Sequence, residues 1–528
     1  MSPYSQHDKF HSILIFFTAV ILCFINLGGH PIYILDEAKN AEAAREMFVN
    51  NDWLVPTFNG ELRTDKPPLH YWFMMISYKI FGVSAFSARF FSAVFGVLTI
   101  LSTFHYTKKF LNRKIALLTT FILCSSIFFM QEFHLAVPDP YLIFFVSFAL
   151  FKFYDFYLNN KLVDGFAFYF ALGLGTLAKG PVAIALPGLI ALVFLLTKRD
   201  FNWRTLKRLN PLLGGILVLA VSVPWYILVH KATNGAFTKG FFIDHNINRF
   251  GSEMEGHGGP PFVTWAFVLL GLLPFSFYIV QGFIHSWKTR KTNDFILFSF
   301  IVSAVFVVFF SISNTKLPNY PMPSYPFMGV LIAIYLGLIL DRTIAIKSYK
   351  ISLWLILIIT LAMPIAGYIA LAMVETQLFD ARFSSVFLAI LSIGSILSMI
   401  FLKRKQLSKS IIALGICSML LTITMFQFVY PTLTDESPLV KAKEIMNTDT
   451  ETILYKGYDP AFLFNFEREF PYATTKAEVM EFLNKYPEAL VITKDKFHAS
   501  DWSENETEVL LEQKALFENY TIVIFKLK

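Results

Sequence analysis

Residues 295–313 read FILFSFIVSAVFVVFFSIS, nineteen residues without a charged side chain. A helix needs about 20 consecutive apolar residues to cross the hydrocarbon core of a bilayer, so this stretch has the composition and length of a membrane span. Similar runs recur along the 528-residue chain, which is 55% hydrophobic and 16% charged. Soluble domains carry about a quarter of their residues as Asp, Glu, Lys or Arg. The sequence therefore predicts a polytopic membrane protein and excludes an ordinary cytosolic globule.

The hydropathy pattern predicts about thirteen transmembrane helices. Their expected ranges are 11–27, 86–106, 115–131, 140–158, 165–180, 181–197, 211–230, 262–284, 295–313, 324–340, 351–373, 384–402 and 408–429. Only Ala178-Lys179-Gly180-Pro181 separates the fifth span from the sixth, a break that a bilayer tolerates at its interface. No small-residue cleavage site follows the first span, so we expect it to remain as an uncleaved anchor.

The distribution of Lys and Arg predicts the orientation. With the N-terminus inside the cell, the inner loops carry twenty Lys and Arg residues and the outer loops carry ten. Cytoplasmic loops are enriched in positive charge, so we expect the N-terminus in the cytoplasm and residues 430–528 outside. Basic residues in short loops act as topology signals, and nucleic-acid binding is not indicated.

Two segments are too long to be simple connections. The first outer loop, about 28–85, contains amphipathic stretches at Asp36–Val49 and Pro67–Phe81, which we expect to lie along the membrane surface and roof a cavity. Residues 430–528 carry a net negative charge and alternate between strand and helix patterns. The fold class is therefore an all-α membrane domain over 1–429 with a small external α/β domain over 430–528.

The three cysteines, Cys23, Cys124 and Cys417, all fall inside predicted spans. A disulfide framework or a cysteine-ligated metal is therefore not expected, because free Cys packs as a small apolar residue. The sequence also contains no internal repeat, glycine-rich phosphate loop or Cys/His metal spacing.

Acidic residues mark two predicted membrane boundaries on the outer side. Asp36 and Glu37 follow the first span directly, and Asp139 lies between two prolines in Val137-Pro138-Asp139-Pro140. An Asp in this position can be a plain helix N-cap. Charged groups near the membrane interior are costly and tend to mark function, which makes Asp36 and Asp139 candidate catalytic residues.

Cations are expected on the same side. Lys66 precedes Pro67-Pro68 in Thr64-Asp65-Lys66-Pro67-Pro68, Lys179 ends a span, and Lys316 lies in Thr315-Lys316-Leu317-Pro318-Asn319-Tyr320. Arg249 and His245 share the loop segment Asp244–Phe250. Each alone could be an ordinary snorkelling or juxtamembrane charge, and His245 could be a base, a metal ligand, an acceptor contact or a hydrogen-bonded loop residue. Together the cations resemble a pocket for a phosphate at the membrane.

These motifs together resemble a known family. Asp36-Glu37, Ala41-Glu42-Ala43-Ala44-Arg45-Glu46-Met47, Lys66-Pro67-Pro68-Leu69, Asp139-Pro140, Ala178-Lys179-Gly180-Pro181, His245-Asn246 with Arg249-Phe250, and Lys316-Leu317-Pro318 with Tyr320-Pro321 resemble the GT-C glycosyltransferases of the protein mannosyltransferase and lipid A aminoarabinose transferase type. The resemblance covers about residues 10–340, while the late spans and the tail match only in layout.

The resemblance implies a function. GT-C enzymes of this type move a sugar, with inversion, from a polyprenyl-phosphate carrier to an acceptor at the periplasmic face of the inner membrane. Lipid A, a protein or another envelope glycan could be the acceptor, and aminoarabinose, mannose or another sugar could be transferred. Residues 1–429 would then form the glycosyltransferase domain, surrounded by membrane lipids.

The same resemblance assigns roles to residues. Asp36 would be the catalytic or acceptor-orienting carboxylate and Asp139 its partner. The substrate-binding residues would be Glu37, Lys66, Lys179, His245, Arg249, Lys316 and Tyr320. Asp65 would be a candidate for contacting a divalent metal ion, the one cofactor that the pattern suggests.

A transporter or flippase for a lipid or a lipid-linked sugar is the alternative, because it would also use intramembrane charges and broken helices. The charged candidates gather at one interface instead of the midplane, and the chain shows no duplicated half. A non-catalytic scaffold is a third possibility, but it would not need this loop chemistry.

Overall fold

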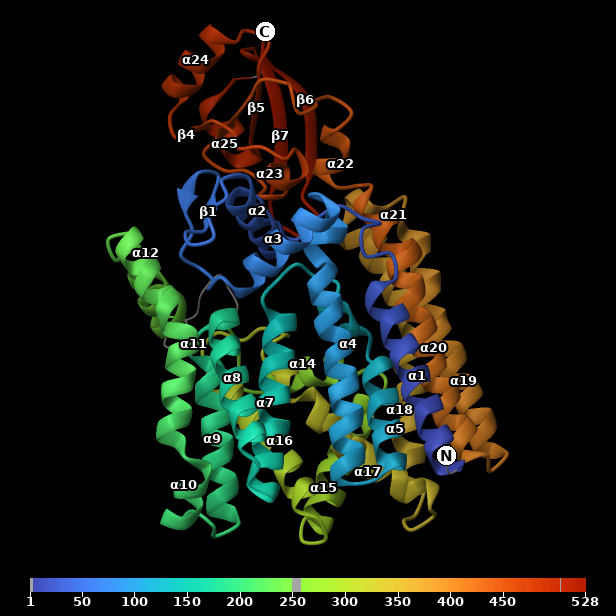
Figure 1. Ribbon diagram of the computed structural model, residues 1–528. Helices are drawn as coiled ribbons and strands as arrows, with labels where there is room; N and C mark the ends of the chain where they lie inside the picture. Colours follow the sequence, from blue (N-terminus) through green and yellow to red (C-terminus); the bar gives the residue numbers. More distant parts are fainter. Residues whose placement is uncertain (1–2, 249–257, 504) are drawn as a thin grey trace.

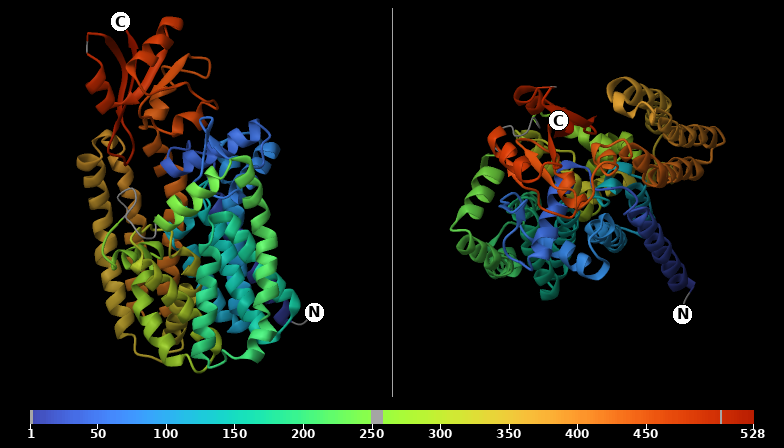
Figure 2. Two further views of the ribbon diagram at one scale, coloured as in Figure 1. Left: turned by 90° about the vertical axis from the view of Figure 1, so that its left-hand side faces the viewer. Right: turned by 90° about the horizontal axis from the view of Figure 1, so that it is seen from above.

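The apolar runs form helices that stand side by side as one bundle, with the C-terminal domain above one end of it and the N-terminus near the other (Figures 1 and 2). The computed structural model describes residues 3–248, 258–503 and 505–528. A GT-C-like helical body with a small mixed domain is what the sequence predicts.

Nine helical segments in the described residues are long and apolar enough to cross a membrane. They are α4 (Ala85–Phe110), α7 (Asp139–Asn159), α8 (Leu162–Lys179), α10 with α11 (Trp203–Leu209, Pro211–Ala232), α16 (Asp294–Ile312), η3 with α17 (Met322–Ser324, Tyr325–Leu340), α18 with η4 (Lys347–Ile369, Ala370–Val374), η6 with α19 (Arg382–Leu388, Ala389–Lys403), and α20 with η7 and α21 (Leu407–Thr424, Met425–Val429, Tyr430–Thr434).

The remaining apolar helices are short, broken or bent. The helix α14 (Val263–Gly271) and the segment of η2 (Phe275–Tyr278) and α15 (Ile279–Thr289) meet at 116°. The others are α1 (Pro3–Phe24), α5 (Arg113–Cys124), α6 (Ile127–Glu132) and α9 (Val182–Thr197), and two short helices, α12 (Ala236–Lys239) and η1 (Gly240–Asn248), follow α11. The predicted number of thirteen spans stays a prediction.

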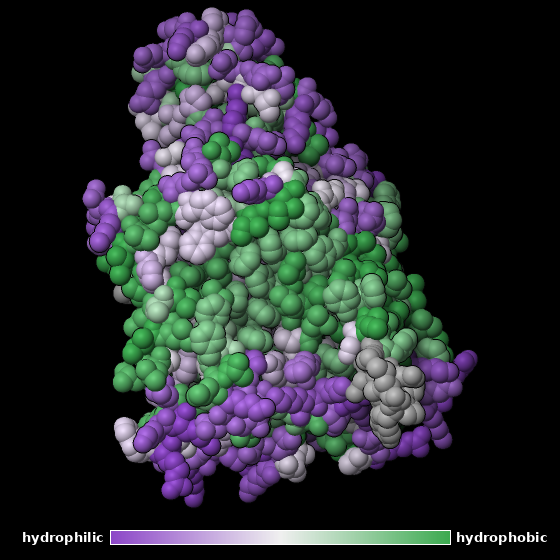
Figure 3. Space-filling view, viewed as in Figure 1, coloured by the Kyte–Doolittle hydropathy of each residue, from purple (hydrophilic) through white to green (hydrophobic). Residues whose placement is uncertain are grey.

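On the face shown in Figure 3, a hydrophobic belt lies between two polar ends. Large apolar side chains such as Leu219, Ile358 and Ile400 are exposed on the outer helices. Exposed apolar surface on this scale is costly in water and suits a lipid environment.

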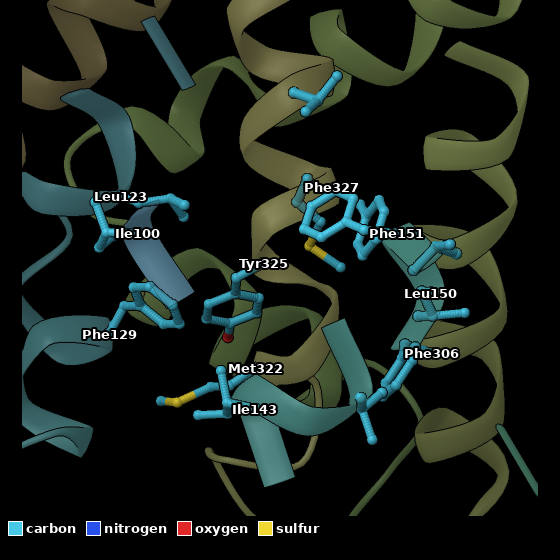
Figure 4. Close-up of a cluster of buried hydrophobic side chains, with 14 of the residues drawn as sticks. Ile100, Leu123, Phe129, Ile143, Leu150, Phe151, Phe306, Met322, Tyr325 and Phe327 are labelled. Carbon is cyan, nitrogen blue, oxygen red and sulfur yellow. The ribbon is translucent and has the colours of Figure 1, made fainter. Parts of the chain in front are cut away.

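Aromatic packing fixes the helices that carry the candidate site. In Figure 4, Phe129 of α6 faces Tyr325 of α17, with their ring centroids 5.8 Å apart, while Phe151 of α7 faces Phe327 at 4.6 Å. All four side chains are fully buried. Large buried aromatics dominate packing energetics, so α6, α7 and α17 hold one another in place near the outer end.

The first outer loop forms α2 (Leu35–Val49), a hairpin of β1 (Thr57–Phe58) and β2 (Glu61–Leu62), and α3 (Leu69–Phe81). The expectation that α2 lies on the membrane surface with one wet face is wrong. Residues 40–47 of α2 are all buried. The helix packs between α3 and α23 (Ala461–Asn465) of the C-terminal domain, so this domain and not water covers its outer face (Figure 1).

The C-terminal region folds around a five-stranded sheet in the order β4-β3-β5-β7-β6. Its strands are β3 (Thr452–Tyr455), β4 (Tyr472–Ala473), β5 (Leu490–Lys494), β6 (Thr507–Lys514) and β7 (Thr521–Leu527), and its other helices are α22 (Pro438–Ala442), α24 (Lys476–Lys485) and α25 (Asp495–Asp501). β3 runs parallel to β4 and β5, while β7 runs antiparallel to β5 and β6, with Val491 opposite Phe525.

The predicted α/β character of the tail is confirmed by this sheet and its helices. The predicted boundary at residue 430 differs from the structure. The helical run of α20, η7 and α21 continues to Thr434 before the chain turns into the external domain.

Candidate active site

Two adjoining cavities lie where the outer ends of α7, α8 and α16 meet the first outer loop. Their volumes are about 260 Å³ and about 560 Å³. Both are lined by the same six polar or aromatic residues, which we call the shared wall: Asp65, Lys66, Asp139, Lys179, His245 and Tyr320.

The two cavities differ in character. The smaller one, the apolar lobe, runs between α7, α9 and α16. Its additional lining residues include Leu142, Val146, Val182, Leu186, Phe306 and Phe310. The larger one, the polar lobe, reaches toward α2 and the C-terminal domain, with Asp36, Lys39, Gln131, Glu132, Asn319 and Glu518 among its lining residues. An elongated apolar molecule with a charged head group fits two adjoining cavities of this character.

Asp36 and Lys66 form one carboxylate–lysine pair in the polar lobe. Asp36 lies in the first turn of α2, where the helix dipole favours a negative charge. Pro67 and Pro68 prevent helix at Lys66, so α3 begins only at Leu69 and the lysine lies on the bend before it. The Lys66 Nζ atom is 3.9 Å from Asp36 Oδ1, and the Asp36 side chain is 50% exposed into the cavity. Both were predicted to be functional, and the structure brings them together.

The charges around Asp36 also set its ionisation. Burial raises the pKa of this carboxyl, but the cations Lys66, Arg63 and Lys179 outweigh burial and hold the pKa below its usual value. Asp36 is therefore a carboxylate at neutral pH.

Asp139 and Lys179 form the second pair. Asp139 is the first residue of α7 and Lys179 the last of α8, positions at which helix dipoles stabilise an acid and a base respectively. The chain leaves α8 through Gly180, whose φ of +85° suits glycine. Lys179 donates to the Asp139 carboxylate, and its Nζ atom is 5.3 Å from the centre of the Tyr320 ring. The Lys179 side chain is 17% exposed and the Asp139 side chain 3% exposed, so both charges are largely shielded from water.

The prolines on either side of Asp139 do not prevent helix there. Pro140 occupies the first turn of α7, where a missing N–H costs nothing. Pro138 immediately precedes the helix. The two prolines thus start α7 at Asp139 instead of interrupting it.

Asp65 lies between two cationic or hydrogen-bonding partners. Arg63 Nη2 is 3.2 Å from one of its carboxylate oxygens and His245 Nε2 is 3.0 Å from the other. Burial raises the pKa of Asp65, but the hydrogen bond from His245 and the charge of Arg63 outweigh it and lower the pKa. In the described part of the chain no group of three or more Asp, Glu, His or Cys residues could hold a metal ion. Asp65 is thus held by Arg63 and His245, and the metal contact at this residue stays a prediction.

The structure places two predicted substrate-binding residues outside the shared wall. Glu37 is fully buried and pairs with Arg89 through two hydrogen bonds of 2.7 and 3.0 Å. The same carboxylate accepts a hydrogen bond from the backbone N–H of Ala136, so it holds the loop before α7. This is a structural position, because Glu37 faces the core side of α2.

Lys316 is also directed elsewhere. It is buried, donates to the backbone carbonyl of Ser313 at 2.6 Å, and lines a separate cavity beside Trp265. Tyr320, four residues later in the same loop, does reach the shared wall. Arg249, the remaining predicted cation, lies outside the described residues.

Sequence reasoning did not identify Arg63, Glu132 or Asn319. Arg63 is buried behind Asp36 and Asp65 and donates to Tyr71 Oη at 3.0 Å. Glu132 and Asn319 line the polar lobe. A signal existed for two of them, because Glu132 is an isolated acid ending an apolar run and Asn319 lies inside the Lys-Leu-Pro-Asn-Tyr motif.

Known proteins share this fold and these segments. Residues 65–228 match the family described as dolichyl-phosphate-mannose-protein mannosyltransferase. An uncharacterized protein of Aquifex aeolicus (strain VF5) is 33% identical over 57% of this chain and 67% of its own length. The crystal structure of ArnT from Cupriavidus metallidurans bound to undecaprenyl phosphate matches with a TM-score of 0.78 at 23% identity, over 97% of both chains.

This chain belongs to the GT-C glycosyltransferases. It is thus a membrane enzyme of the protein mannosyltransferase and aminoarabinose transferase type, as its motifs predicted, and a multi-pass protein of the inner membrane. A curated GT-C relative from Pseudomonas fluorescens (strain Pf0-1), undecaprenyl phosphate-alpha-4-amino-4-deoxy-L-arabinose arabinosyl transferase 2, is 29% identical over 56% of this chain. The chain covers 54% of the length of that relative.

Proposed function

We propose that this GT-C enzyme transfers a sugar from a polyprenyl-phosphate carrier to a cell-envelope acceptor, and that the shared wall is where the two substrates meet. The observation that carries the proposal is the position of two carboxylate–lysine pairs between an apolar lobe and a polar lobe. A lipid-linked sugar has the same order of parts: an isoprenoid chain, a phosphate and a polar ring.

The carrier occupies the apolar lobe with the first part of its chain. Phe306, Phe310 and Leu186 provide apolar contacts there. The phosphate then lies at the shared wall beside Lys66 and Lys179, because charge-assisted hydrogen bonds from ammonium groups are the strong contacts for a phosphate. Tyr320 lies close enough to Lys179 to position it.

Asp36 receives the proton of the acceptor. The acceptor oxygen attacks the anomeric carbon from the face opposite the phosphate, its O–H proton passes to the Asp36 carboxylate, and the bond from the anomeric carbon to the phosphate oxygen breaks. The electron pair of that bond stays on the departing polyprenyl phosphate, where Lys66 and Lys179 stabilise the charge. Attack from the opposite face inverts the anomeric centre.

Asp139 acts through Lys179. Its carboxylate accepts from the lysine at the helix ends of α7 and α8, so it fixes the cation that faces the phosphate. We therefore assign a positioning role to Asp139, and we assign contact with the acceptor or the phosphate to His245 and Arg249.

The acceptor is proposed to be a lipid-anchored envelope molecule such as lipid A, with a protein or another glycan as alternatives. A further cavity of about 420 Å³ adjoins the polar lobe between α21 and the loop joining β6 to β7, with Leu35, Tyr430, Leu433, Leu516 and Phe517 among its lining residues. Apolar walls of this kind suit an acyl chain beside the site. The excess of basic residues on the opposite end favours a periplasmic position for the site and for residues 435–528.

Mass spectrometry of envelope lipids and glycoproteins from cells with and without the gene tests this function. A lipid A species that loses one sugar increment in the deletion strain, restored by the wild-type gene, supports the proposal. A glycoprotein that loses the sugar increment in the deletion strain would indicate that the acceptor is a protein instead of lipid A. Identical envelope lipids, glycans and glycoproteins in both strains would contradict it.

The competing function, a flippase or transporter, would need a polar route to both sides of the membrane. The carboxylate–lysine pairs instead gather at the first residue of α7, at the last residue of α8 and on the first outer loop. This one-sided arrangement favours transfer at one face.

A further inference from the structure

Glu132 is an acid of the polar lobe that the mechanism does not use. It ends α6, its residue surface is 7% exposed, and it lines the lobe with Gln131 and Asn319. Within the described residues its Oε1 atom has no hydrogen-bond partner. A buried polar atom without a partner costs free energy, so its persistence points to a ligand that supplies the missing group.

A second buried atom of the lobe is in the same state. The Oδ1 atom of Asn319 has no hydrogen-bond partner among the residues that the structure describes, and Asn319 lines the same lobe as Glu132. Both unpartnered atoms are hydrogen-bond acceptors. They would repel a phosphate, and they match a hydroxyl or an ammonium group.

The charges of the lobe favour the same kind of ligand. Five acids and three lysines line it: Asp36, Asp65, Glu132, Asp139 and Glu518, against Lys39, Lys66 and Lys179. Asp36 and Asp139 are paired with lysines, and Asp65 is paired with Arg63 and His245. Glu132 is thus the buried acid of the polar lobe that these ion pairs do not include, so it is available to a ligand.

The location of Glu132 identifies which substrate it meets. Glu132 lines the polar lobe together with Asp139 and Lys179. Lys179 is the proposed phosphate contact, and the sugar is the part of the donor attached directly to that phosphate. Glu132 is also held firmly, because Phe129, one helical turn earlier, packs on Tyr325 (Figure 4).

We propose that Glu132, assisted by Asn319, binds the transferred sugar of the lipid-linked donor by accepting a hydrogen bond from a hydroxyl or ammonium group of its ring. Glu132 is a specificity-determining residue in this account, because it contacts the sugar, whereas Lys66 and Lys179 contact the phosphate of the carrier. The inference rests on the proposed function, since it assumes a sugar-loaded polyprenyl phosphate at the shared wall.

Binding of three probes to the purified full-length protein tests the inference without turnover. The probes are undecaprenyl phosphate, undecaprenyl phosphate carrying mannose, and undecaprenyl phosphate carrying 4-amino-4-deoxy-L-arabinose. We expect the wild type to bind at least one sugar-bearing probe more tightly than the bare carrier. Glu132→Ala should weaken binding of that sugar-bearing probe about tenfold or more and leave binding of the bare carrier unchanged, as expected for loss of a buried hydrogen bond.

Glu132→Gln separates the two ligand chemistries. Retained affinity identifies a hydroxyl, which an amide oxygen still accepts, whereas a loss equal to that of Glu132→Ala identifies an ammonium group. Asn319→Ala should give a smaller loss for the same probe and provides a second test if Glu132→Ala does not fold. The control is Glu481→Gln, which removes an exposed carboxylate from α24 of the external domain.

The outcomes separate this inference from the function beneath it. Unchanged affinity of Glu132→Ala for the sugar-bearing probes, or an equal loss for the bare carrier, would overturn the sugar contact. A wild type that binds the bare carrier but gains nothing from either sugar would overturn it as well, with the carrier site intact. A wild type that binds none of the three probes would contradict the proposed function itself.

Discussion

Lys66 Nζ lies 3.9 Å from Asp36 Oδ1, with the lysine side chain 13% exposed and the aspartate side chain 50% exposed. The cation is therefore set into the wall of the polar lobe while the carboxylate stays open to a substrate. This asymmetry suits a lysine that stabilises a phosphate and an aspartate that takes a proton from an incoming acceptor.

Replacing Lys66 with Ala should weaken use of the donor. One of the two cations proposed to hold the carrier phosphate is lost, so we expect the KM for the donor to rise about tenfold, the scale of one charge-assisted hydrogen bond. Initial rates over a range of donor concentrations measure this effect. A donor dependence equal to that of the wild type would argue against contact between Lys66 and the phosphate.

Replacing Lys179 with Met should destabilise the fold. The Asp139 side chain is 3% exposed, and losing its partner leaves a buried charge uncompensated, which costs about 3–5 kcal/mol. The double variant Lys179→Met with Asp139→Leu should recover much of the loss. The free energy of unfolding of the purified protein in detergent, determined for the single and the double variant, measures both effects.

The matched control for this pair is Lys198→Met. Lys198 and Asp294 form a pair at 2.7 Å whose side chains are 28% and 37% exposed. Exposed pairs contribute about 1 kcal/mol or less. Equal destabilisation by Lys179→Met and Lys198→Met would contradict the importance of burial at Asp139.

Replacing Glu37 with Gln should reduce stability more than substrate affinity. Glu37 and Arg89 are both fully buried, and the variant leaves the guanidinium with a neutral partner. We expect a lower unfolding temperature but near-normal donor and acceptor KM in the protein that folds, with Glu61→Gln as an exposed control. A fully stable Glu37→Gln protein that binds its substrates poorly would restore the substrate-binding role predicted from the sequence.

The acid side of the pH–rate profile should depend on Lys66. Asp36 has a lowered pKa because Lys66, Arg63 and Lys179 outweigh burial and the nearby charge of Asp65, so the wild-type carboxylate stays ionised to below its usual pKa of about 4. Lys66→Met removes one cation, which raises this pKa, so the loss of kcat on acidification should begin at a higher pH. A profile unchanged or moved to lower pH would show that Asp36 does not limit the acid side.

Much of the fold was predictable because the bilayer limits the alternatives. Spans such as 295–313 need only a count of apolar residues, and α16 begins within one residue of the prediction. The position of α2 was not predictable. Its buried Ala43 and Ala44 contact surfaces supplied by α3 and by residues more than 400 positions later in the chain, and no local pattern encodes that cover.

Some residues of the candidate site could likewise be predicted from the sequence, and others could not. Asp139 and Lys179 stand out as charges beside a proline or a glycine at span ends, Lys66 precedes two prolines, and Asp36 follows the first span, so their motifs could be recognised. Glu37 could not be separated from Asp36, because one step along a helix turns a side chain by about 100° from cavity to core. Lys316 and Tyr320 show the same limit, since their loop directs only the tyrosine toward the shared wall.

Transfer by purified Asp36→Asn protein, measured beside binding of undecaprenyl phosphate, tests the central claim most directly. Wild-type protein supplied with a matched lipid-linked sugar and envelope acceptor provides the reference rate. The account predicts that Asp36→Asn loses about 10²- to 10⁴-fold in kcat, the contribution typical of a general base, while carrier affinity stays within a few-fold of the wild type. Near-normal turnover by Asp36→Asn would contradict it.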